Sequence, residues 1–294
     1  MKKFHLIIIL LITAVIIIYA DSYIYSGTRN TGNFLKIPVG ARVEALGGAY
    51  IAVSDDIEGI NSNPAGLALE DRFLIGATIG KHYLETDYNF FGIMIPTEYI
   101  GNISISAVYL NYGTQEEYDE NGSLTGEFTC FDTAVTLTLS NTIFSGLYAG
   151  VNARYIETKL GDYSGGTFAG DIGILWNPKF YRNMFVGAVI RNFGLSMKVD
   201  EMANELSLIY GVGLGIYPVK HLNHRVLLSL DYEKAEDTPD IYKLGMEYLF
   251  FNTASLRLGM EISEFSEKEL SYGIGLTRWN IGLNYSITSH ESLD

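Results

Sequence analysis

Cysteine is nearly absent from this chain of 294 residues, and proline is scarce, with 6 residues. The single cysteine, Cys130, excludes an intramolecular disulfide and any cysteine-based metal cluster. The few prolines, beside 31 glycines, argue against collagen-like or disordered structure. Basic residues are also in the minority, with 20 Lys and Arg against 34 Asp and Glu. The net charge is −14, whereas nucleic-acid-binding proteins carry basic patches, so we expect no nucleic-acid partner.

The first twenty residues are typical of a secretory signal peptide. Lys2 and Lys3 precede an apolar run from Leu6 to Tyr19, and Ala20 is a suitable last residue before cleavage. The run is short for a bilayer-spanning helix, which needs about 20 apolar residues. A retained anchor is the alternative, because a bulky isoleucine occupies the third position before the cut. We expect export with residues 1–20 removed, and loss of the two lysines takes the charge from −14 to −16.

Beyond residue 72 the chain consists of short segments in which apolar and polar residues alternate. The stretch RVLLSLDYEK (225–234), for example, places apolar residues at every second position. A period of two indicates β-strands with one apolar face. About thirteen such segments follow one another, many near the ten-residue length of a tilted membrane-spanning strand. They lie near 73–80, 88–95, 102–112, 130–140, 146–157, 168–177, 184–192, 208–217, 226–233, 241–250, 255–262, 270–277 and 280–287.

The connections between these segments fall alternately into two kinds. One kind, with 17 acidic and 5 basic residues in total, comprises 81–87, 113–128, 158–167, 193–206, 234–240 and 263–269. The other kind is generally shorter, has a net charge of +4 and comprises 96–101, 141–145, 178–183, 218–225, 251–254 and 278–279. A soluble sandwich has no reason to alternate in this way. The pattern is typical of a bacterial outer-membrane barrel, with longer external loops and short periplasmic turns.

The strand face opposite to the apolar one is rich in glycine and carries charges of both signs. These charged residues are Arg154, Asp171, Arg191, Asp231, Glu233, Lys243, Glu247, Arg257 and Glu261. Such a face fits a lightly packed barrel lumen, in which charges of opposite sign pair. We therefore expect residues 73–294 to form an all-β, transmembrane antiparallel β-barrel in contact with outer-membrane lipid. A soluble all-β domain is the alternative.

The most distinctive sequence lies between the signal peptide and the first strand, in residues 21–72. It reads FLKIPVGARVEALGGAYIAVSDDIEGINSNPAGLA, from Phe34 to Ala68. This stretch resembles the start of the PorV/PorQ family, within the FadL-like outer-membrane barrels, and is UPF0164-like. The matching positions are Pro38, Gly40, Ala41, Arg42, Gly47, Gly48, Ala49, Asp55, Asp56, Asn63, Pro64, Ala65 and Gly66. The resemblance implies that residues 21–72 fold into the barrel as an N-terminal hatch and that the barrel has about fourteen strands.

The residue types of this segment suit a plug. We take eight residues as the hatch motif: Gly47, Gly48, Asp55, Asp56, Asn63, Pro64, Ala65 and Gly66. The paired glycines allow close approach to the lumen wall, and the acidic pair can accept hydrogen bonds from lumen arginines or lysines. The Asn-Pro-Ala-Gly stretch suits a tight turn toward the first strand. A phosphate-binding loop lacks its GxxxxGK[ST] motif, and a calcium site at the acidic pair lacks further spaced ligands.

The parity of the strands leaves an open question at the end of the barrel. Thirteen strands that start from the periplasm leave the last one ending outside and the barrel unclosed. The resemblance implies a further closing strand, whereas the sequence given stops at SITSHESLD. Either the final strand is missing from this sequence, or the segment from Thr31 to Val39 pairs at the seam. An open seam is costly because unpaired backbone groups would face lipid.

Residues that could carry catalysis or bind metal are few. His221 and His224 lie in a short basic turn, interpreted as a solvated periplasmic turn rather than a metal pair. His82, with Asp87 nearby, is the only hint of an enzyme and is equally explained as a loop residue. Cys130 is expected to open a strand as a small packed residue. We therefore expect a non-enzymatic protein with no catalytic residue, no cofactor and no metal.

Two functions remain. The resemblance implies a role in type IX secretion or surface attachment, in which acidic external loops, above all 113–128, dock secreted proteins or other envelope components. The alternative is a channel for hydrophobic small molecules such as fatty acids, passing through the lumen. A glycine-rich, lightly filled lumen would leave room for them, but few apolar residues are evident on the inward face. The resemblance favours the secretion role.

Overall fold

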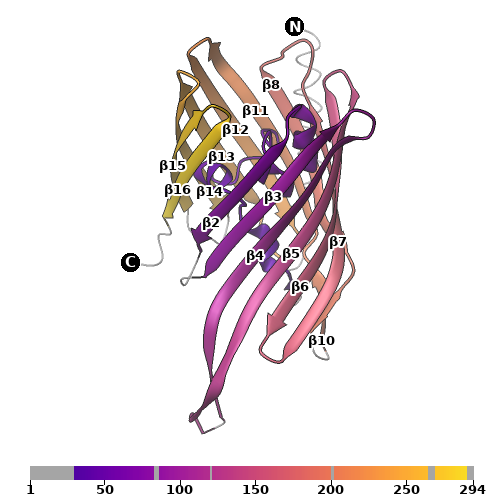
Figure 1. The fold of residues 1–294 in the computed structure, drawn as a ribbon, viewed down its shortest axis with the longest axis vertical. Helices are drawn as coiled ribbons and strands as arrows, with labels where there is room; N and C mark the ends of the chain where they lie inside the picture. Colours follow the sequence, from indigo (N-terminus) through magenta and orange to yellow (C-terminus); the bar gives the residue numbers. More distant parts are fainter. Residues whose placement is uncertain (1–29, 83–85, 120, 200–201, 264–268, 290–294) are drawn as a thin grey trace.

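The protein folds as a curled antiparallel sheet around its N-terminal segment (Figure 1). The computed structural model describes residues 30–82, 86–119, 121–199, 202–263 and 269–289. Among these, 13 strands form one sheet. They are β2 (Leu74–Lys81), β3 (Asp87–Thr97), β4 (Gly101–Tyr118), β5 (Leu124–Phe144), β6 (Leu147–Leu160), β7 (Tyr163–Trp176), β8 (Met184–Gly194), β11 (Ile209–His221), β12 (His224–Ala235), β13 (Ile241–Phe250), β14 (Ala254–Ser263), β15 (Glu269–Arg278) and β16 (Ile281–Ser289). The all-β antiparallel class and the thirteen expected strands are confirmed.

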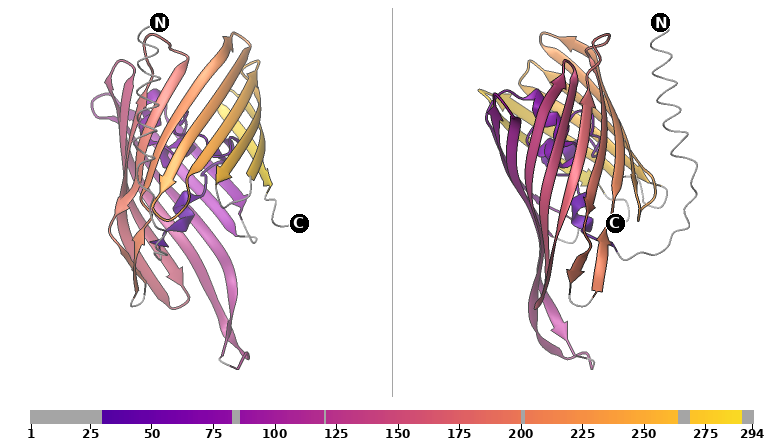
Figure 2. Two further views of the ribbon diagram at one scale, coloured as in Figure 1. Left: turned by 180° about the vertical axis from the view of Figure 1, so that it is seen from behind. Right: turned by 90° about the vertical axis from the view of Figure 1, so that its right-hand side faces the viewer.

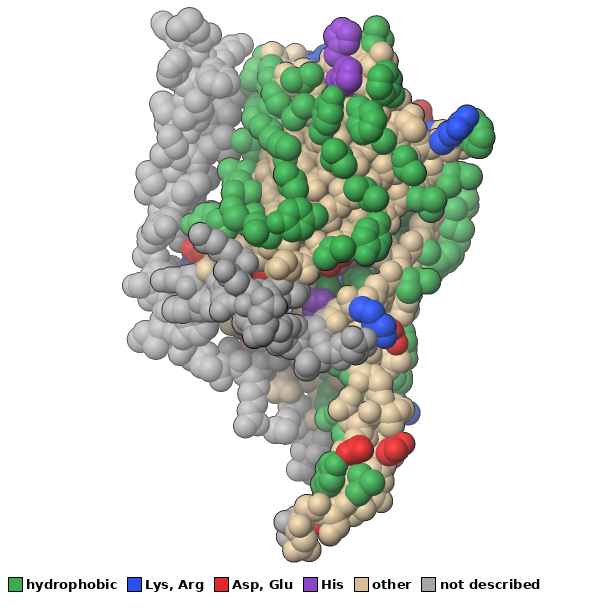
Figure 3. Space-filling model, turned by 90° about the vertical axis from the view of Figure 1, so that its left-hand side faces the viewer, with side chains coloured by type: hydrophobic (Ala, Val, Ile, Leu, Met, Phe, Trp, Pro, Cys, Tyr) green, Lys and Arg blue, Asp and Glu red, His purple; other side chains and the backbone are tan. Residues whose placement is uncertain are grey.

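The sheet turns its apolar face outward and its charged face inward, the reverse of the arrangement in a soluble domain. Along β13, Leu244 and Met246 are 38% and 40% exposed on the outer face, whereas Lys243 and Glu247 are 5% and 3% exposed on the inner face. Apolar side chains cover much of the outer surface of the sheet (Figure 3). Among the described residues, no helix is long and apolar enough to cross a membrane. The charged face is therefore turned inward, as the sequence predicted.

Antiparallel order places the two kinds of connection at opposite ends of the sheet. We call them the acidic end, which points down in Figure 1, and the basic end. The 113–128 connection at the acidic end was expected to be a loop, and this expectation is wrong. β4 continues to Tyr118 and β5 begins at Leu124, so that the two strands form a ribbon projecting beyond the rest of the sheet (Figure 1).

A small second sheet lies at the acidic end. β1 (Asn30–Thr31) pairs in parallel with β10 (Met202–Leu206), which pairs with β9 (Met197–Val199). The chain then forms the short helix η1 (Asn33–Lys36), where Lys36 Nζ lies 2.6 Å from Asp237 Oδ2. The proposed pairing of Thr31 to Val39 at the barrel seam is therefore wrong, because this segment is engaged with β10 and the β12–β13 connection.

The seam lies between β2 and β16, the two edges of the 13-stranded sheet. These strands run in the same direction, because twelve successive antiparallel pairings separate them. Arg72 Nη1 donates to Asn280 Oδ1 at 3.2 Å, which links the two edges at the basic end. No fourteenth strand closes the sheet among the described residues, so the barrel is open here.

The segment from residue 32 to residue 72 fills the interior of the sheet, and we call it the hatch (Figure 2). It contains α2 (Ala41–Ala45), η2 (Glu58–Asn61) and η3 (Pro64–Leu69). Its central residues are fully enclosed, with Leu46, Tyr50 and Ile51 at 0% exposure. Residues 21–29 of the expected hatch segment lie outside the described residues. Much of the core inside the sheet is therefore formed by the hatch, which precedes the strands in the sequence.

Candidate functional site: the hatch in the lumen

The hatch meets the wall backbone to backbone where glycines face one another. Gly47 and Gly48 have φ values of 61° and 72°, a left-handed conformation that favours glycine. A β-carbon added to Gly47 would lie 2.4 Å from the backbone nitrogen of Met260 in β14. One added to Gly259 would lie 2.0 Å from the nitrogen of Gly47. Neither position has room for a side chain.

Other lumen glycines form the rest of the seat of the hatch. β-Carbons at Gly187 and Gly213 would lie within 2.9 Å of Ile51 atoms, and one at Gly150 would lie 2.4 Å from Pro64. One at Gly173 would lie 2.0 Å from the side-chain oxygen of Asn63. The sequence interpretation of these glycines as spare lumen volume is therefore wrong, because the hatch occupies the space that they leave.

An ion cluster centred on Arg42 holds α2 to the next part of the hatch and to the wall. The Arg42 guanidinium binds Asp55, lies 3.2 Å from Asp56 and donates to Glu247 Oε2 of β13 at 3.0 Å. Arg257 also donates to Glu247 Oε2, at 2.7 Å. Burial alone would lower the pKa of Arg42, but the surrounding carboxylates raise it well above its usual value. The acidic pair therefore binds a hatch cation, in place of the lumen arginine or lysine that the sequence analysis invoked.

Wall side chains also bind the hatch backbone directly. Asp231 Oδ2 of β12 accepts from the Ile51 amide at 2.7 Å, and Asn152 Nδ2 of β6 donates to the Ile60 carbonyl at 3.0 Å. Asn63 Nδ2 donates to the carbonyls of Ile51 and Ile174, at 2.9 and 3.1 Å. Its Oδ1 accepts from the Ala65 amide, which makes Asn63 the cap of η3 rather than the start of a tight turn. These bonds fix the hatch to β6, β7 and β12.

The remaining motif residues pack within this framework. Pro64 is the first residue of η3, and Ala65 and Gly66 are buried behind it. A β-carbon on Gly66 would lie 1.7 Å from the carbonyl oxygen of Ser54. The structure thus brings the Asn-Pro-Ala-Gly stretch against the acidic-pair region of the hatch, in a packing that only glycine permits at residue 66.

Buried wall charges of opposite sign pair with one another, between neighbouring strands or across one intervening strand. Arg191 Nη2 lies 2.8 Å from Glu233 Oε1, and Lys243 Nζ lies 2.9 Å from Glu233 Oε2. Arg154 Nη2 lies 2.8 Å from Asp171 Oδ2. Such pairing in an enclosed lumen is what the mixed charge of the inward face indicated.

An apolar cluster lies inside the lumen, mainly in the half nearer the acidic end, and we call it the lumen cluster. The wall contributes Tyr88, Phe90, Met94, Val108, Leu110, Ala134, Ile156 and Ala169. The hatch contributes Phe34, Val39, Ile57, Ile60 and Leu67, and Met197 and Leu206 come from β9 and β10. The expectation that few apolar residues converge on the inward face is therefore wrong.

The hatch residue Glu58 lies beside this cluster. Its Oε1 accepts from Thr78 Oγ1 of β2 at 2.6 Å, and its Oε2 is buried. Burial, together with the nearby charge of Asp56, raises the pKa of Glu58 to about 7. Glu44 marks the other side of the seam, where its carboxylate accepts from Ser286 at 2.7 Å and Thr288 at 3.2 Å of β16. The hatch therefore binds both edges of the open sheet.

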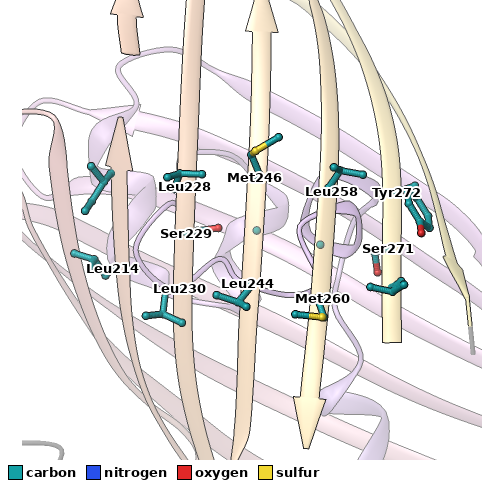
Figure 4. A pocket seen from close by; sticks show the side chains of 14 residues that line it. Leu214, Leu228, Ser229, Leu230, Leu244, Met246, Leu258, Met260, Ser271 and Tyr272 are labelled. Carbon is teal, nitrogen blue, oxygen red and sulfur yellow. The ribbon is translucent and has the colours of Figure 1, made fainter. Parts of the chain in front are cut away.

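An apolar groove of about 590 Å³ lies on the outer face of β11 to β15 (Figure 4). Leu228, Met246 and Leu258 line one side of it. Gly245 and Gly259 form part of its floor, and their inner sides contact Leu46 and Gly47 of the hatch. A single backbone layer therefore separates the groove from the hatch.

The other candidate residues lie apart from the hatch motif. His221 and His224 face each other at the β11–β12 turn, and His224 Nδ1 lies 2.7 Å from Tyr248 Oη. Asp87 pairs with Lys81 at 2.6 Å, while His82 lines a small cavity with Glu44 and Glu261. Cys130 is buried within β5, opposite Leu160, rather than at its start.

Sequence reasoning missed the lumen cluster and the roles of Glu44 and Glu58. β3 gave the strongest available signal, since Phe90 and Met94 face inward while Phe91 and Ile95 face outward. A strand that is apolar on both faces needs an apolar partner on its inner side as well. The hatch supplies that partner.

Comparisons with known proteins place the fold. A search of curated protein sequences gives no significant match. Among solved structures, the Pseudomonas putida toluene transporter TodX is similar with a TM-score of 0.55 and 13% identity, over 85% of this chain and 91% of that one. The Ralstonia pickettii toluene transporter TbuX is similar with a TM-score of 0.59 and 12% identity, over 85% and 92%. The TM-scores show a shared fold, and at identities this low the similarity shows the fold alone.

The family assignment comes from the sequence. The model of the family described as "Uncharacterised protein family (UPF0164)" matches residues 25–290. This range contains the hatch and all 13 strands of the main sheet. The chain therefore belongs to the UPF0164 family, with the fold of these β-barrel transporters.

Proposed function

We propose that this protein is an outer-membrane barrel through which hydrophobic small molecules pass, with its hatch closed in the present structure. The observation that carries the proposal is the lumen cluster, an apolar surface inside the barrel and next to a removable plug. Wall residues such as Phe90, Leu110 and Ile156, each 3% exposed or less, would face a hydrophobic solute once the hatch moved. The shared fold with two toluene transporters supports the same function.

The outer face and the two ends of the sheet support a location in the outer membrane. The outer face is apolar and suits lipid, and the acidic and basic ends suit the outside and the periplasm respectively. The signal peptide expected at residues 1–20 would bring the chain there by export. In this orientation the lumen cluster lies nearer the external side of the hatch, where a solute would arrive.

Uptake by whole cells tests this proposal. The cells need an outer membrane covered with lipopolysaccharide and no hydrophobic uptake channel of their own. We expect production of the protein to raise the initial uptake rate of labelled oleate and toluene severalfold, with no effect on labelled maltose. Uptake equal to that of cells with an empty vector, while the barrel is folded in the outer membrane, would contradict the channel.

A pair of matched variants links uptake to the lumen cluster. Val108→Thr adds a hydroxyl of nearly equal volume inside the cluster, where an unpaired hydroxyl costs about 1–3 kcal/mol. Val135→Thr makes the same change on the neighbouring strand, on the outer face, where Val135 is 40% exposed. We expect Val108→Thr to lower oleate uptake severalfold and Val135→Thr to leave it unchanged. If both variants changed oleate uptake equally, the lumen cluster would have no specific role in transport.

A second candidate is the PorV-type role in secretion or surface attachment of proteins. The observation that favours it is the acidic β4–β5 ribbon, which projects from the proposed external end (Figure 1). On this hypothesis, deletion of 113–128 abolishes recovery of a secreted partner and leaves the barrel folded. If recovery of the secreted partner were unchanged by the deletion, the ribbon would not dock that partner.

A further inference from the structure

The ribbon has two strand edges with no partner among the described residues. The last pairing of β4 with β3 is Asn111 with Asp87, and the first pairing of β5 with β6 is Cys130 with Leu160. Beyond these points β4 and β5 pair only with each other, as far as Tyr118 and Leu124. We call residues 112–119 and 121–128 the acidic ribbon. Its free edges present backbone N–H and C=O groups that can pair with another extended chain.

The charge of the acidic ribbon has one sign. Its described residues include Glu116, Glu117, Asp119 and Glu127, and no lysine or arginine. Glu116 and Glu127 lie directly opposite each other in the ladder, an arrangement of like charges that destabilises a strand pair. None of the ion pairs among the described residues involves their carboxylates, and Glu116 accepts only from Tyr118 Oη. A cation brought by a partner would relieve this repulsion.

The acidic ribbon is also held in a defined shape. At its base, Tyr112 Oη donates to Asp132 Oδ2 at 2.6 Å, and the same carboxyl group accepts from Thr158. At its tip, Asp119 Oδ1 accepts from the amides of Ser123 and Asn121, at 2.8 and 2.9 Å. These bonds lower the pKa of Asp119 and keep it ionised. A strand that binds here therefore meets an edge that is already extended, which limits the entropy lost on binding.

We propose that the acidic ribbon binds an extended, lysine- or arginine-rich segment of a partner protein, which adds as a strand to one of its free edges. Backbone pairing supplies the adhesion, and basic side chains placed beside Glu116 and Glu127 supply the selectivity. A second copy of this chain is a poor occupant because its ribbon carries the same charge. An anionic lipid surface is repelled for the same reason.

This inference rests on the second proposed function and is independent of hydrophobic uptake. It names the chemistry that a secreted partner must carry, namely a cationic segment able to form a strand. Apolar residues at the tip, Tyr118 at 57% and Leu124 at 59% exposure, provide contacts for alternate side chains of that segment.

The test uses the full-length barrel in detergent or nanodiscs and three synthetic peptides of equal length. One alternates lysine and threonine, one alternates lysine and proline, and one alternates glutamate and threonine. Proline removes the backbone donor and keeps the charge. We expect the lysine–threonine peptide to bind and to slow hydrogen exchange in residues 114–118 or 124–128. The other two peptides should bind at least tenfold more weakly.

Charge variants on the exposed ribbon complete the test. The double variant Glu116→Gln with Glu127→Gln should weaken binding of the lysine–threonine peptide about tenfold, with less effect at high salt. Asp162→Asn, an exposed acid at the neighbouring β6–β7 turn, should leave binding unchanged. Equal binding of the lysine–proline peptide, or no loss in the double variant, would overturn strand addition at this edge. If partner recovery still required residues 113–128 in that case, the secretion role would stand without this mode of recognition.

Discussion

The carboxyl group of Glu58, a hatch residue, contacts β2. Thr78 of β2 donates to one oxygen, and the charges of Asp56 and Arg42 act on the carboxyl group in opposite directions. Its pKa of about 7 lies above the 4.5 of an ordinary glutamate. The folded state therefore favours the protonated acid, and this contribution is complete below pH 4.5 and lost as the pH rises through 7.

We expect the hatch of the wild-type protein to loosen as the pH rises from 5 to 8. The shift of the Glu58 pKa corresponds to about 3 kcal/mol across this window. Glu58→Gln keeps the shape and removes the ionisation, so its hatch should stay closed at pH 8. Hydrogen exchange of residues 41–69 at pH 5 and pH 8 measures the effect. An equal pH dependence in the variant would assign the change to another group.

Arg42 joins more carboxylates than any other hatch residue described above. Arg42→Ala would leave Asp55 and Asp56 without their cation and leave Glu247, 3% exposed, with Arg257 alone. Removal of one member of a buried pair costs about 3–5 kcal/mol. Arg72→Ala is the control, since Arg72 is an exposed hatch arginine that pairs with Glu70 at the surface. We expect a large loss of thermal stability in the first variant and a small one in the second.

The hatch as an element depends on backbone contact at Gly47. Gly47→Ala would place a methyl group 2.4 Å from the Met260 nitrogen, in addition to the strain of a φ of 61°. Gly122→Ala shares the strain, with a φ of 79°, but its β-carbon would lie in open space at the ribbon turn. We expect Gly47→Ala to displace the hatch and to raise ion conductance in planar bilayers. Gly122→Ala should conduct like the wild type. If Gly47→Ala also conducted like the wild type, the hatch would close the barrel without this backbone contact.

The strands of the sheet could be predicted from the sequence because each face has its own period-two pattern. In β13, lysine, glycine and glutamate alternate with leucine and methionine, and the structure places the first set inward. Strand ends were less predictable. The ribbon extension of β4 and β5 consists of exposed polar residues, and no buried face gives them an alternating pattern.

The candidate site was only partly predictable because its partners are distant in sequence. The motif glycines indicated close packing, yet the surface that they meet includes Gly259, more than 200 residues away. The acidic pair indicated a cation, but only the folded hatch shows that this cation is Arg42. The lumen cluster combines the hatch with β3 to β7, β9 and β10, and the clearest local sign of it is β3, which is apolar on both faces.

Across the whole molecule, the hatch is enclosed between two apolar groups. The lumen cluster packs against it toward the acidic end, and a second group that includes Tyr217, Leu227 and Phe185 packs against it toward the basic end. Bonds from β2, β6, β7, β12, β13 and β16 hold it between them. The hatch residues of the lumen cluster are buried against the wall, so the proposed passage of a hydrophobic solute requires the hatch to move.

The most direct test of this account is hydrogen exchange of the hatch with and without a hydrophobic ligand. Oleate would be added to the purified barrel at pH 6, and exchange followed in residues 41–69 and in the strands. The account predicts faster exchange in the hatch, including the Ile51 amide bound to Asp231, with the strands unchanged. Saturating oleate that leaves hatch exchange unaltered would contradict a hatch-gated passage for hydrophobic molecules.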